Sequence, residues 1–322
     1  MSEPEPAKSA QTCWVVTDGT AGMENQAMGL AERLDLPTIT KRVKLRWPWN
    51  KLAPYSLGSP LARLTPESNE IVPLWPRLAI GVGRQSIPVM LAIKRASGGR
   101  TLTVQTQNPR IAAGRFDLVI PPEHDALRGP NVFPILGSPN RITPEKLSAA
   151  RTQFAPLFAN LRGPRLGVLI GGKNRAYAFD EQTTTELARA LADLSKTMGL
   201  MVTPSRRTGE ANVAQIATAL EGTDAFVWRG EGENPYLGVL GWADAFLVTA
   251  DSVNLASEAA ATGKPVHIFR LPGHSAKFDA FHRALENRGI SRTFSGSIEQ
   301  WTYAPLDETA RAARRIRELL DV

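Results

Sequence analysis

Short apolar runs alternate with amphipathic stretches along almost the whole chain. In the first half, an apolar run over residues 12–17 is followed by a glycine-rich turn over 18–22 and a helical pattern over 23–34. Repeated units of this kind are typical of βαβ structure and predict parallel sheets. Further strands are predicted over 78–82, 101–106 and 117–120, and a further helix over 85–96.

A second series of such units begins after the sequence Arg162-Gly163-Pro164. Its predicted strands cover 165–170, 200–203, 225–228, 245–249 and 265–269, and its predicted helices cover 180–198, 209–220, 252–262 and 307–320. Between the two series, residues 137–164 contain a polar loop and one helix. Proline and glycine interrupt the pattern there, so we expect a domain boundary in this stretch.

The length of 322 residues is about twice that of a typical single domain. We therefore predict an α/β protein with two Rossmann-like domains, over 12–150 and 151–305, that face each other across a cleft holding the active site. Residues 1–11 are predicted to form a disordered tail. Residues 306–322 are predicted to form a C-terminal helix that packs back on the N-terminal domain.

Composition narrows the class of protein. Hydrophobic residues make up 43% of the chain, which is enough for a full core in each half. The longest apolar runs, such as 243–250, are too short to span a bilayer, and the N-terminus lacks the apolar stretch of a signal peptide. The single cysteine, Cys13, lies in a predicted buried strand, which excludes a disulfide framework and fits a reducing cytoplasmic compartment.

The net charge of +7 favours an anionic partner. Residues 36–66, the basic segment, contain no acidic residue. Its cations are interleaved with Trp47, Trp49 and Tyr55, and they are Lys41, Arg42, Lys44, Arg46, Lys51 and Arg63. This pattern indicates either contact with an anionic membrane surface, at the inner face of the membrane, or a solvated loop whose tryptophans pack back on the domain. Nucleic acid is not expected, because no known nucleic-acid-binding motif occurs.

The strongest chemical signal lies in residues 247–266, which predict a strand, a polar turn, a short helix and another strand. Asp251 or Ser252 can cap this helix, and the free N–H groups at its start make an anion site suited to a diphosphate. Glu258, about two turns further on, can accept hydrogen bonds from the two ribose hydroxyls of a nucleotide. The alternative is a plain capped helix that carries an exposed glutamate.

Two more loops at predicted strand ends favour anions. Residues 170–175 pair two glycines, which let the backbone approach a phosphate, with the cations Lys173 and Arg175. Residues 203–208 follow the next strand, and successive carboxyl-terminal loops of a parallel sheet converge on one crevice. An ordinary turn would explain either loop alone. The predicted nucleotide-sugar site consists of Gly171, Gly172, Lys173, Asn174, Ser205, Arg206, Arg207, Asp251, Ser252 and Glu258.

The turn over residues 18–26 occupies the same position in the first half. Asp18 and Glu24 are candidate general bases, and Asn25 and Gln26 can orient an acceptor hydroxyl. The alternative is a helix start in which Asp18 caps and Glu24 complements the helix dipole. The motif at 81–86 lacks the third glycine of a dinucleotide fingerprint, although Arg84 can bind an acceptor phosphate. Acceptor or membrane contact is predicted for Asn25, Arg84, Arg46, Trp47 and Trp49.

Several expected motifs are absent from the sequence. No Asp-x-Asp motif occurs, and the four histidines, at 124, 267, 274 and 282, have no zinc spacing. We therefore expect no metal and no resident cofactor, with the nucleotide sugar as substrate. No Gly-x-Ser-x-Gly elbow occurs either, and Cys13 is expected to be buried and inert.

Two motifs carry a family resemblance. Residues 250–260, running on to Pro265, and the Pro-Ser-Arg-Arg sequence at 204–207 resemble the plant elongated-mitochondria fission-factor (ELM) family and its bacterial homologues. The resemblance extends from Asp18 to the segment around Trp301. In plants, membership implies an adaptor that recruits a dynamin-like protein to mitochondria.

The C-terminal half also resembles the membrane-associated transferase that adds GlcNAc to the lipid-linked peptidoglycan precursor, which has a glycosyltransferase-B (GT-B) fold. That resemblance implies ribose recognition by Ser257 and Glu258, and phosphate contact by Gly171 and Gly172. The histidine-containing glycine motif of that enzyme is replaced here by residues 18–22.

These features predict a metal-independent transferase that moves a sugar from a nucleotide diphosphate to a lipid or envelope acceptor. Two alternatives share the predicted fold. One is a nucleotide-sugar 2-epimerase, which requires paired acid and base carboxylates and no lipid acceptor. The other is a non-catalytic adaptor, which should tolerate loss of Asp18 and Glu24.

Overall fold

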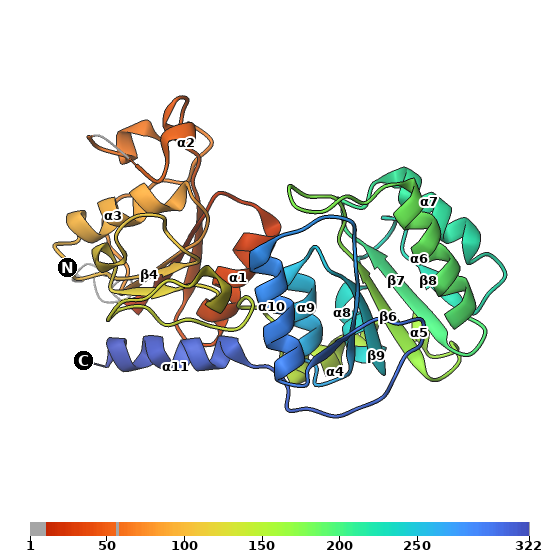
Figure 1. The fold of residues 1–322 in the computed structure, drawn as a ribbon. Coiled ribbons are helices and arrows are strands. Elements are labelled where there is room, and N and C mark those ends of the chain that lie inside the picture. The colour runs from red at the N-terminus through yellow and green to blue at the C-terminus, as the bar shows by residue number, and fades with distance from the viewer. Residues whose placement is uncertain (1–10, 56–57, 322) are drawn as a thin grey trace. The chain divides into compact units, whose positions relative to one another are not determined.

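The computed structural model describes residues 11–55 and 58–321 (Figure 1). The chain divides into two compact units, one comprising Met1–Arg141 with Asp307–Val322 and the other Ile142–Leu306. Apart from Gln11, the predicted tail over 1–11 lies outside the described residues. The sequence placed the boundary after residue 150, whereas the units separate after Arg141 and the helix that follows belongs to the second unit.

The described part of the first unit contains a parallel five-stranded sheet in the order β2-β1-β3-β4-β5. The strands are β1 (Cys13–Thr17), β2 (Thr38–Arg42), β3 (Leu78–Gly81), β4 (Leu102–Thr106) and β5 (Leu118–Ile120). In the register, Cys13 lies opposite both Thr38 and Leu78. Strand β2 was not predicted, because its sequence TITKR holds a single apolar residue and lies at the half-exposed edge of the sheet.

Both faces of this sheet are buried, as expected for parallel strands. Cys13 and Val15 face a core shared with α1 (Ala21–Glu32), whereas Trp14 and Val16 face a core shared with α3 (Ser86–Ala96). Because successive side chains of a strand point to opposite faces, the apolar run of β1 supplies both cores at once.

The C-terminal helix α11 (Glu308–Leu320) packs on the first unit. Its residues Ala312, Ala313 and Ile316 are fully buried in the same core as α1. The side chain of Arg311 donates to the carbonyl oxygen of Pro134 at 2.6 Å, and the Asn140 amide donates to Thr309 Oγ1 at 2.9 Å. The helix is therefore fixed to the sheet by apolar burial and by polar contacts at its first turn.

The second unit contains a parallel six-stranded sheet among its described residues, in the order β11-β10-β9-β6-β7-β8. The strands are β6 (Arg165–Ile170), β7 (Gly199–Pro204), β8 (Ala225–Val227), β9 (Ala245–Thr249), β10 (Val266–Phe269) and β11 (Ser291–Thr293). Strand β11 was not predicted, since it has only three residues and lies at the edge of the sheet.

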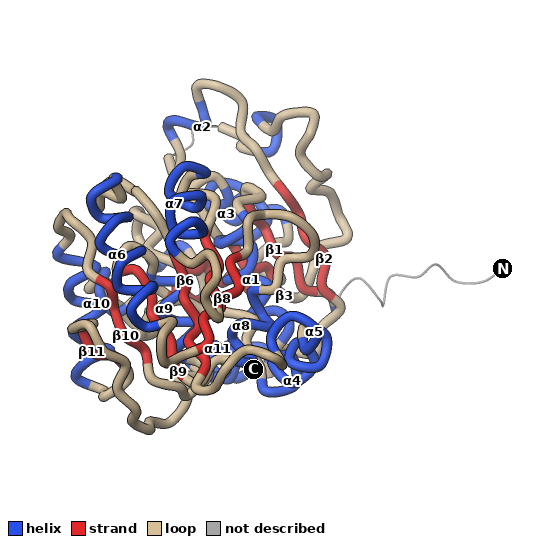
Figure 2. The backbone as a smooth tube through the Cα atoms, turned by 90° about the vertical axis from the view of Figure 1, so that its right-hand side faces the viewer, coloured by secondary structure: helices blue, strands red, loops and turns tan. Residues whose placement is uncertain are grey.

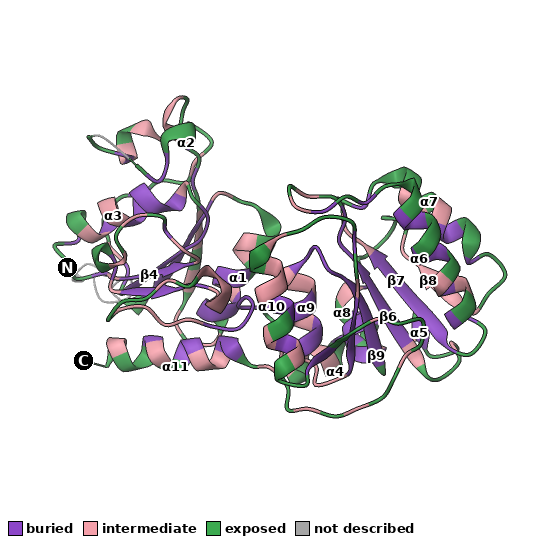
Figure 3. Cartoon of the chain, in the orientation of Figure 1, coloured by how far each residue is buried: buried purple, intermediate pink, exposed green. Residues whose placement is uncertain are grey.

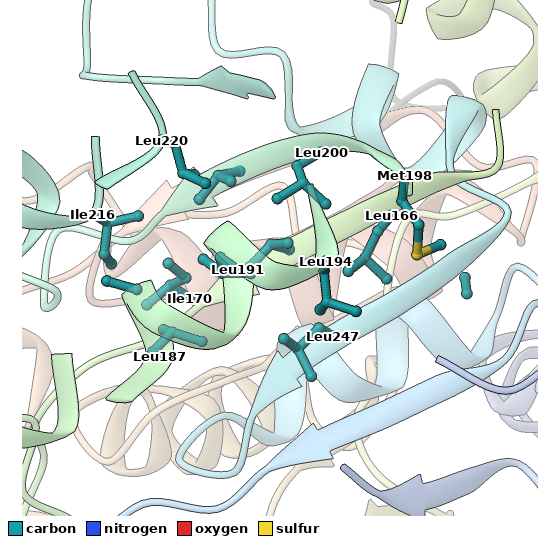
Figure 4. Packing of buried hydrophobic residues seen from close by; sticks show 14 of the residues in the cluster. Leu166, Ile170, Leu187, Leu191, Leu194, Met198, Leu200, Ile216, Leu220 and Leu247 are labelled. Carbon is teal, nitrogen blue, oxygen red and sulfur yellow. The ribbon is translucent and has the colours of Figure 1, made fainter. Parts of the chain in front are cut away.

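One face of this sheet is covered by α6 (Glu181–Leu194) and α7 (Glu210–Ala219). Figure 4 shows Leu187, Leu191 and Leu194 of α6 directed at strand residues such as Leu166 and Leu247. The amphipathic stripe of α6 therefore accounts for most of this core. The remaining helices of the unit are α4 (Pro144–Gln153), α5 (Ala155–Phe158), α8 (Tyr236–Trp242), α9 (Val253–Ala260) and α10 (Ala276–Asn287).

Helix α4 packs closely on α8, which explains why the second unit starts before residue 150. A Cβ atom at Gly241 would lie 2.8 Å from the carbonyl oxygen of Leu147, so only glycine permits this approach. The Trp242 indole also donates to the carbonyl oxygen of Arg151 at 2.7 Å. The two glycines of α8 weaken its helical propensity, and α8 was therefore not predicted.

The segment between β2 and β3 contains little regular structure (Figure 2). It includes the one-turn helix α2 (Trp49–Leu52) and a 3-10 turn over Leu61–Arg63. Residues of α2 are exposed or half-exposed (Figure 3). No helix within 11–55 and 58–321 is both long and apolar enough for a bilayer span.

Candidate functional site

The order of the strands shows where in the second unit a ligand is expected. From β6 the chain continues to β7 and β8 on one side, then returns to place β9 on the other side. Such a reversal separates the loops that follow two neighbouring strands, and ligands of open α/β sheets bind at this point. The loop after β6 carries Gly171 and Gly172, and the loop after β9 carries Asp251 and Ser252. The reversal therefore coincides with the predicted anion-binding loops.

Asp251 is the centre of this site. Its carboxylate accepts hydrogen bonds from Thr249 Oγ1 at 2.7 Å and from the Gly172 amide at 3.0 Å. Nη2 of Arg207 lies 2.8 Å from Oδ2 of the same carboxylate. Burial is the largest influence on this group and raises its pKa, while Thr249, Arg207 and Gly172 oppose the rise. The carboxylate thus connects the loops after β6, β7 and β9.

The glycine pair permits this arrangement. A Cβ atom at Gly171 would overlap both carboxylate oxygens of Asp251. Gly172 has a φ of +144° and would overlap the carbonyl group of Arg207. The Gly171 amide donates to Thr249 Oγ1 at 2.8 Å, and the Gly172 amide donates to Asp251. The two amides that were assigned to a phosphate therefore have partners within the protein.

Hydroxyl groups of the loop after β7 also hold the loop after β6, residues 171–174, which we call the glycine loop. Thr208 Oγ1 donates to the carbonyl oxygen of Gly171 at 2.7 Å, and the Ser205 hydroxyl donates to the same oxygen. The Ser205 hydroxyl also accepts a hydrogen bond from the Arg207 amide at 3.2 Å. Ser205 is consequently a residue that shapes the loop, and its hydroxyl is engaged there.

Asn174 closes the glycine loop. Its side-chain amide donates to the carbonyl oxygen of Asp251 at 3.1 Å, and its Oδ1 accepts from the amides of Ala176 at 2.7 Å and Tyr177 at 3.0 Å. All polar atoms of this side chain thus serve the loop itself. The sequence assigned Asn174 to the ligand, whereas the contacts give it a positioning role.

Three cations of these loops remain exposed. The side chains of Lys173, Arg175 and Arg206 form no hydrogen bond or ion pair with any residue in the described part of the chain. Ser252 caps α9 by accepting from the Leu255 amide at 3.3 Å. A capped helix start beside unpaired cations has the electrostatics of an anion site.

Glu258 is half-buried on α9 and accepts a hydrogen bond from the Tyr236 hydroxyl of α8. Desolvation is the largest cause of its shift and raises its pKa to about 7, while the Tyr236 hydrogen bond opposes this rise. Glu258 is therefore not the exposed glutamate of the alternative interpretation. The Ser257 hydroxyl, assigned to ribose by resemblance, is buried and donates to the carbonyl oxygen of Val253 at 2.7 Å.

The sheet of the first unit has a reversal of the same kind, between β1 and β3. Asp18 follows β1, and the loop after β3 passes so close that a Cβ atom at Gly83 would lie 3.3 Å from Asp18 Oδ2. Asp18 is half-buried, and its Oδ1 accepts from the Thr20 amide at 3.1 Å. Asp18 is thus at the point of this sheet where a ligand is expected.

Glu24 is already paired. Its carboxylate accepts two hydrogen bonds from the Arg42 guanidinium, from Nε at 3.0 Å and from Nη2 at 2.8 Å. These contacts hold the pKa of Glu24 below its usual value. A carboxylate stabilised in this way is a weak proton acceptor. Sequence reasoning assigned Arg42 only to the basic segment, so this pair was not predicted.

The other residues assigned to the acceptor differ in their surroundings. Asn25 is exposed on α1, whereas its neighbour Gln26 is buried and accepts from Gln107 Nε2 at 3.0 Å. Arg84 is exposed, and its guanidinium donates to the carbonyl oxygens of Asn50 at 2.9 Å and Lys51 at 3.4 Å. Arg84 therefore caps the end of α2, since cations stabilise the carboxyl end of a helix.

The two predicted membrane tryptophans also differ. Trp47 is 78% exposed. The ring of Trp49 is covered by the Arg63 guanidinium, whose central carbon lies 3.7 Å from the ring centroid. Arg46 Nε donates to the carbonyl oxygen of Leu64 at 2.9 Å. Only Trp47 of these three residues presents its side chain freely to solvent.

The thiol of Cys13 is buried in β1, and burial raises its pKa to about 12. Such a thiol is not ionised at neutral pH and is a poor nucleophile. Within the described residues, no three side chains of His, Cys, Asp or Glu gather as a metal site. His274 Nδ1 lies 3.0 Å from Asp279 Oδ2 at the surface.

The family model described as mitochondrial fission ELM1 matches residues 21–320. The chain belongs to this family. The mitochondrial fission protein ELM1 of Arabidopsis thaliana is 33% identical over 274 residues, which cover 76% of this chain and 64% of the plant protein. An uncharacterized protein of Rickettsia prowazekii is 27% identical, over 96% of this chain and 98% of that protein. The match to the plant member of the family thus spans less than two thirds of its length.

Solved structures place this ELM1-family chain in the GT-B fold, as the sequence predicted. MurG of Acinetobacter baumannii has a TM-score of 0.51 at 15% identity, over 96% of this chain and 98% of that chain. The UDP-GlcNAc 2-epimerase of Methanocaldococcus jannaschii has a TM-score of 0.57 at 10% identity, over 95% and 99%. The Neisseria meningitidis 2-epimerase, bound to UDP-GlcNAc, has a TM-score of 0.54 at 13% identity, over 96% and 99%. At these identities the likeness establishes two Rossmann-like domains and no activity.

Proposed function

We propose that this protein is a metal-independent glycosyltransferase, which moves a sugar from a nucleotide diphosphate to a lipid or envelope acceptor at a membrane surface. The observation that carries the proposal is the meeting of three anion-favouring loops at the strand reversal of the second unit, beside Glu258 on α9. Nucleotide-sugar binding by a structural relative, the Neisseria epimerase with UDP-GlcNAc, supports this use of the fold.

The diphosphate of the donor would bind at the start of α9 and between the unpaired cations Lys173 and Arg206. Both side chains are exposed on loops that the Asp251 carboxylate holds together. In this proposal the glycine pair shapes the loop, because its amides are engaged by Thr249 and Asp251. Fixed cations and helix dipoles stabilise the charge that develops on a departing diphosphate.

The ribose would be recognised by Glu258. The Tyr236 hydroxyl donates to Oε2, and no residue in the described part of the chain donates to Oε1. Oε1 can therefore accept a hydrogen bond from a ribose hydroxyl. Since desolvation raises the pKa of Glu258 to about 7, ligand hydroxyls that stabilise the carboxylate would replace lost solvation.

Asp18 is the proposed general base. It lies at the strand reversal of the first unit, and the neighbouring Glu24 is paired with Arg42, which lowers the pKa of Glu24. Asp18 has a single hydrogen bond to its own turn, from the Thr20 amide. A base must be within reach of the proton it removes, and the end of β1 is where an acceptor hydroxyl is expected.

The donor site is tested by thermal unfolding of the purified protein with UDP, GDP and their common sugar conjugates. Ligand at one hundred times its dissociation constant stabilises the native state by about 2.7 kcal/mol. We expect one nucleotide to raise Tm, and Glu258→Gln to abolish the rise. Glu221→Gln is the matched control, because Glu221 is exposed and its carboxylate has no partner among the described residues. If no nucleotide at millimolar concentration raises Tm, the proposal is wrong.

A non-catalytic adaptor is the second candidate. It is favoured by the internal partners of the Gly171 and Gly172 amides and of Glu24, since a binding platform needs no free catalytic groups. The name of the plant relative, a mitochondrial fission protein, agrees with such a role in that protein. A transferase requires Asp18, whereas an adaptor should retain full complementation when Asp18 is replaced by Ala.

A 2-epimerase of nucleotide sugars is the third candidate, supported by the similar fold of the Methanocaldococcus enzyme. It requires no second substrate. Incubation with the nucleotide sugar that raises Tm separates the two enzymes, because an epimerase produces an isomeric nucleotide sugar and a transferase releases the nucleoside diphosphate only when an acceptor is present.

A further inference from the structure

Residues 47–55, in the segment between β2 and β3, present three large apolar side chains to solvent. Trp47 is 78% exposed, Tyr55 is 67% exposed and Leu52 is 49% exposed. All three lie on or beside the single turn of α2, and we call them the apolar tip. Isolated apolar side chains are common at protein surfaces, whereas a group of large ones in so short a segment marks an interaction site.

A small cavity of about 50 Å³ lies next to the apolar tip. Its lining residues are Pro54, Gly58, Pro60, Pro88, Leu91, Ala92, Arg95 and Arg115. Helix α3 provides one wall, because Pro88, Leu91 and Arg95 have the spacing of one helix face. The cavity is therefore lined by uncharged residues and two arginines.

The two arginines have no counter-charge. Arg95 and Arg115 are exposed, and neither guanidinium has a hydrogen bond or ion pair with any residue that the structure describes. No acidic residue lines the cavity or occurs between Leu36 and Pro66. A cavity with two unpaired guanidinium groups, next to the exposed apolar tip, complements a molecule that joins a phosphate to hydrocarbon.

The apolar tip is also connected to the strand reversal of the first unit. Arg84 donates to the carbonyl oxygens of Asn50 and Lys51 in α2, and it directly follows Gly83, which lies against Asp18. Gln85 Oε1 accepts from the Leu45 amide at 3.0 Å and ties the same loop to the start of the segment. The loop that carries Gly83 and Arg84 therefore links α2 to the strand reversal that holds the proposed general base.

We propose that this face of the first unit binds the headgroup layer of an anionic bilayer. Trp47, Leu52 and Tyr55 enter the interface, and Arg95 and Arg115 hold a lipid phosphate in the cavity. Indole and phenol rings favour the interface, and arginines favour anionic headgroups. The inference deepens the membrane part of the proposed function and rests on it only for the role of the lipid as acceptor.

Flotation with vesicles tests this surface in the full chain. Vesicles of phosphatidylcholine are compared with vesicles that contain about one third phosphatidylglycerol, without nucleotide. We expect binding to the anionic vesicles alone. Each arginine at a membrane surface contributes about fivefold, so Arg95→Gln with Arg115→Gln should weaken binding about 30-fold. Arg189→Gln with Arg229→Gln is the control, because both residues are exposed in the second unit and give the same change of charge.

The apolar tip is tested separately. Trp47→Ala with Leu52→Ala should remove the binding that persists at high salt, because salt screens the arginines and leaves apolar insertion. Absence of binding to anionic vesicles, or an equal loss in the control pair, would overturn the proposal. A single-stranded oligonucleotide that displaces the protein from vesicles as well as anionic lipid does would identify a general polyanion site instead.

The membrane proposal and the nucleotide-sugar proposal can be refuted independently of each other. The variants at Arg95 and Arg115 should keep the nucleotide-dependent rise of Tm, since both residues are in the first unit and the donor site is in the second. Flotation without nucleotide is unaffected by the outcome of the nucleotide titration.

Discussion

The carboxylate of Asp251 lies 2.8 Å from Nη2 of Arg207, although the aspartate side chain has no exposed surface and the arginine side chain is 44% exposed. One member of the ion pair is thus in a low-dielectric interior and the other is in contact with water. Removal of a partner leaves a buried charge without compensation, which is costly. The pair joins the loops after β7 and β9 and therefore sets the geometry of the candidate donor site.

Arg207→Gln is expected to lower the free energy of unfolding by about 2 kcal/mol at pH 7, less than for a fully buried pair because Arg207 is partly solvated. The substitution should raise the pKa of Asp251 further above its usual value, because the Arg207 guanidinium of the unaltered protein opposes the effect of burial. A raised native pKa gives stability that is present at low pH and lost as pH increases, so the deficit should be smaller at pH 5. Urea unfolding at pH 5 and pH 7 measures this loss of stability.

Arg206→Gln is the control for this measurement. Arg206 is the exposed neighbour of Arg207, and its guanidinium has no partner among the described residues. Surface changes of this kind alter stability by about 0.5 kcal/mol or less. Equal effects of the two variants would contradict a stabilising role for the Asp251 pair.

Gly171→Ala is expected to destabilise the protein by about 2 to 3 kcal/mol, because the new Cβ atom overlaps the buried carboxylate of Asp251. Gly114→Ala is the matched control, since a Cβ atom there has no neighbour within 4 Å. Thermal and urea unfolding compare the two substitutions. Similar stability of both variants would mean that the loops after β6 and β9 do not pack as closely as described.

The repeated strands and helices were predictable because their burial is regular. Strand β9 and strand β6 have the predicted bounds, since their residues are apolar at both faces and almost all buried. Edge strand β2 was not predicted, because its half-exposed sequence lacks such a run. Helix α10 was not predicted, although Phe278, Phe281 and Leu285 carry a helical spacing.

The sequence predicted that the three loops of the candidate site lie together, but not how their residues pair. Parallel topology explains why loops far apart in the sequence meet at Asp251. The partners of Glu24 and Glu258 come from β2 and α8, two elements that the sequence did not predict. Without those elements, neither the lowered pKa of Glu24 nor the raised pKa of Glu258 was deducible.

Asp18→Asn is expected to reduce transferase turnover by a factor of about 10² to 10⁴, because a general base contributes an acceleration of that size. Glu24→Gln should retain most of the turnover, since the Glu24 carboxylate is engaged by Arg42 and its pKa is lowered. Release of nucleoside diphosphate in the presence of acceptor measures both. A larger loss in the Glu24 variant, with unchanged unfolding, would assign the base to Glu24.

The raised pKa of Glu258 makes stability depend on pH. Below its unfolded pKa of 4.5 the carboxyl is protonated in both states, and its favourable contribution is complete. As pH increases towards the native pKa of about 7, ionisation is disfavoured in the folded state and the contribution is lost. The loss is at most about 3 kcal/mol, reduced by the partial exposure of the group. Urea unfolding from pH 4.5 to 7.5 should show this slope, and Glu258→Gln should remove it.

Tyr236→Phe separates ribose recognition from simple burial of Glu258. The Tyr236 hydroxyl donates to Glu258 and lowers the pKa of its carboxyl, against the larger effect of desolvation. Loss of this donor should therefore move the pKa of Glu258 above 7. If the ionised carboxylate binds ribose, the pH at which nucleotide affinity is half-maximal should increase in this variant, while affinity at high pH should be retained. Calorimetric titrations from pH 6 to pH 9 measure this midpoint. An unchanged midpoint, or an affinity reduced equally at every pH, would mean that Tyr236 only supports the packing of α8 on α9.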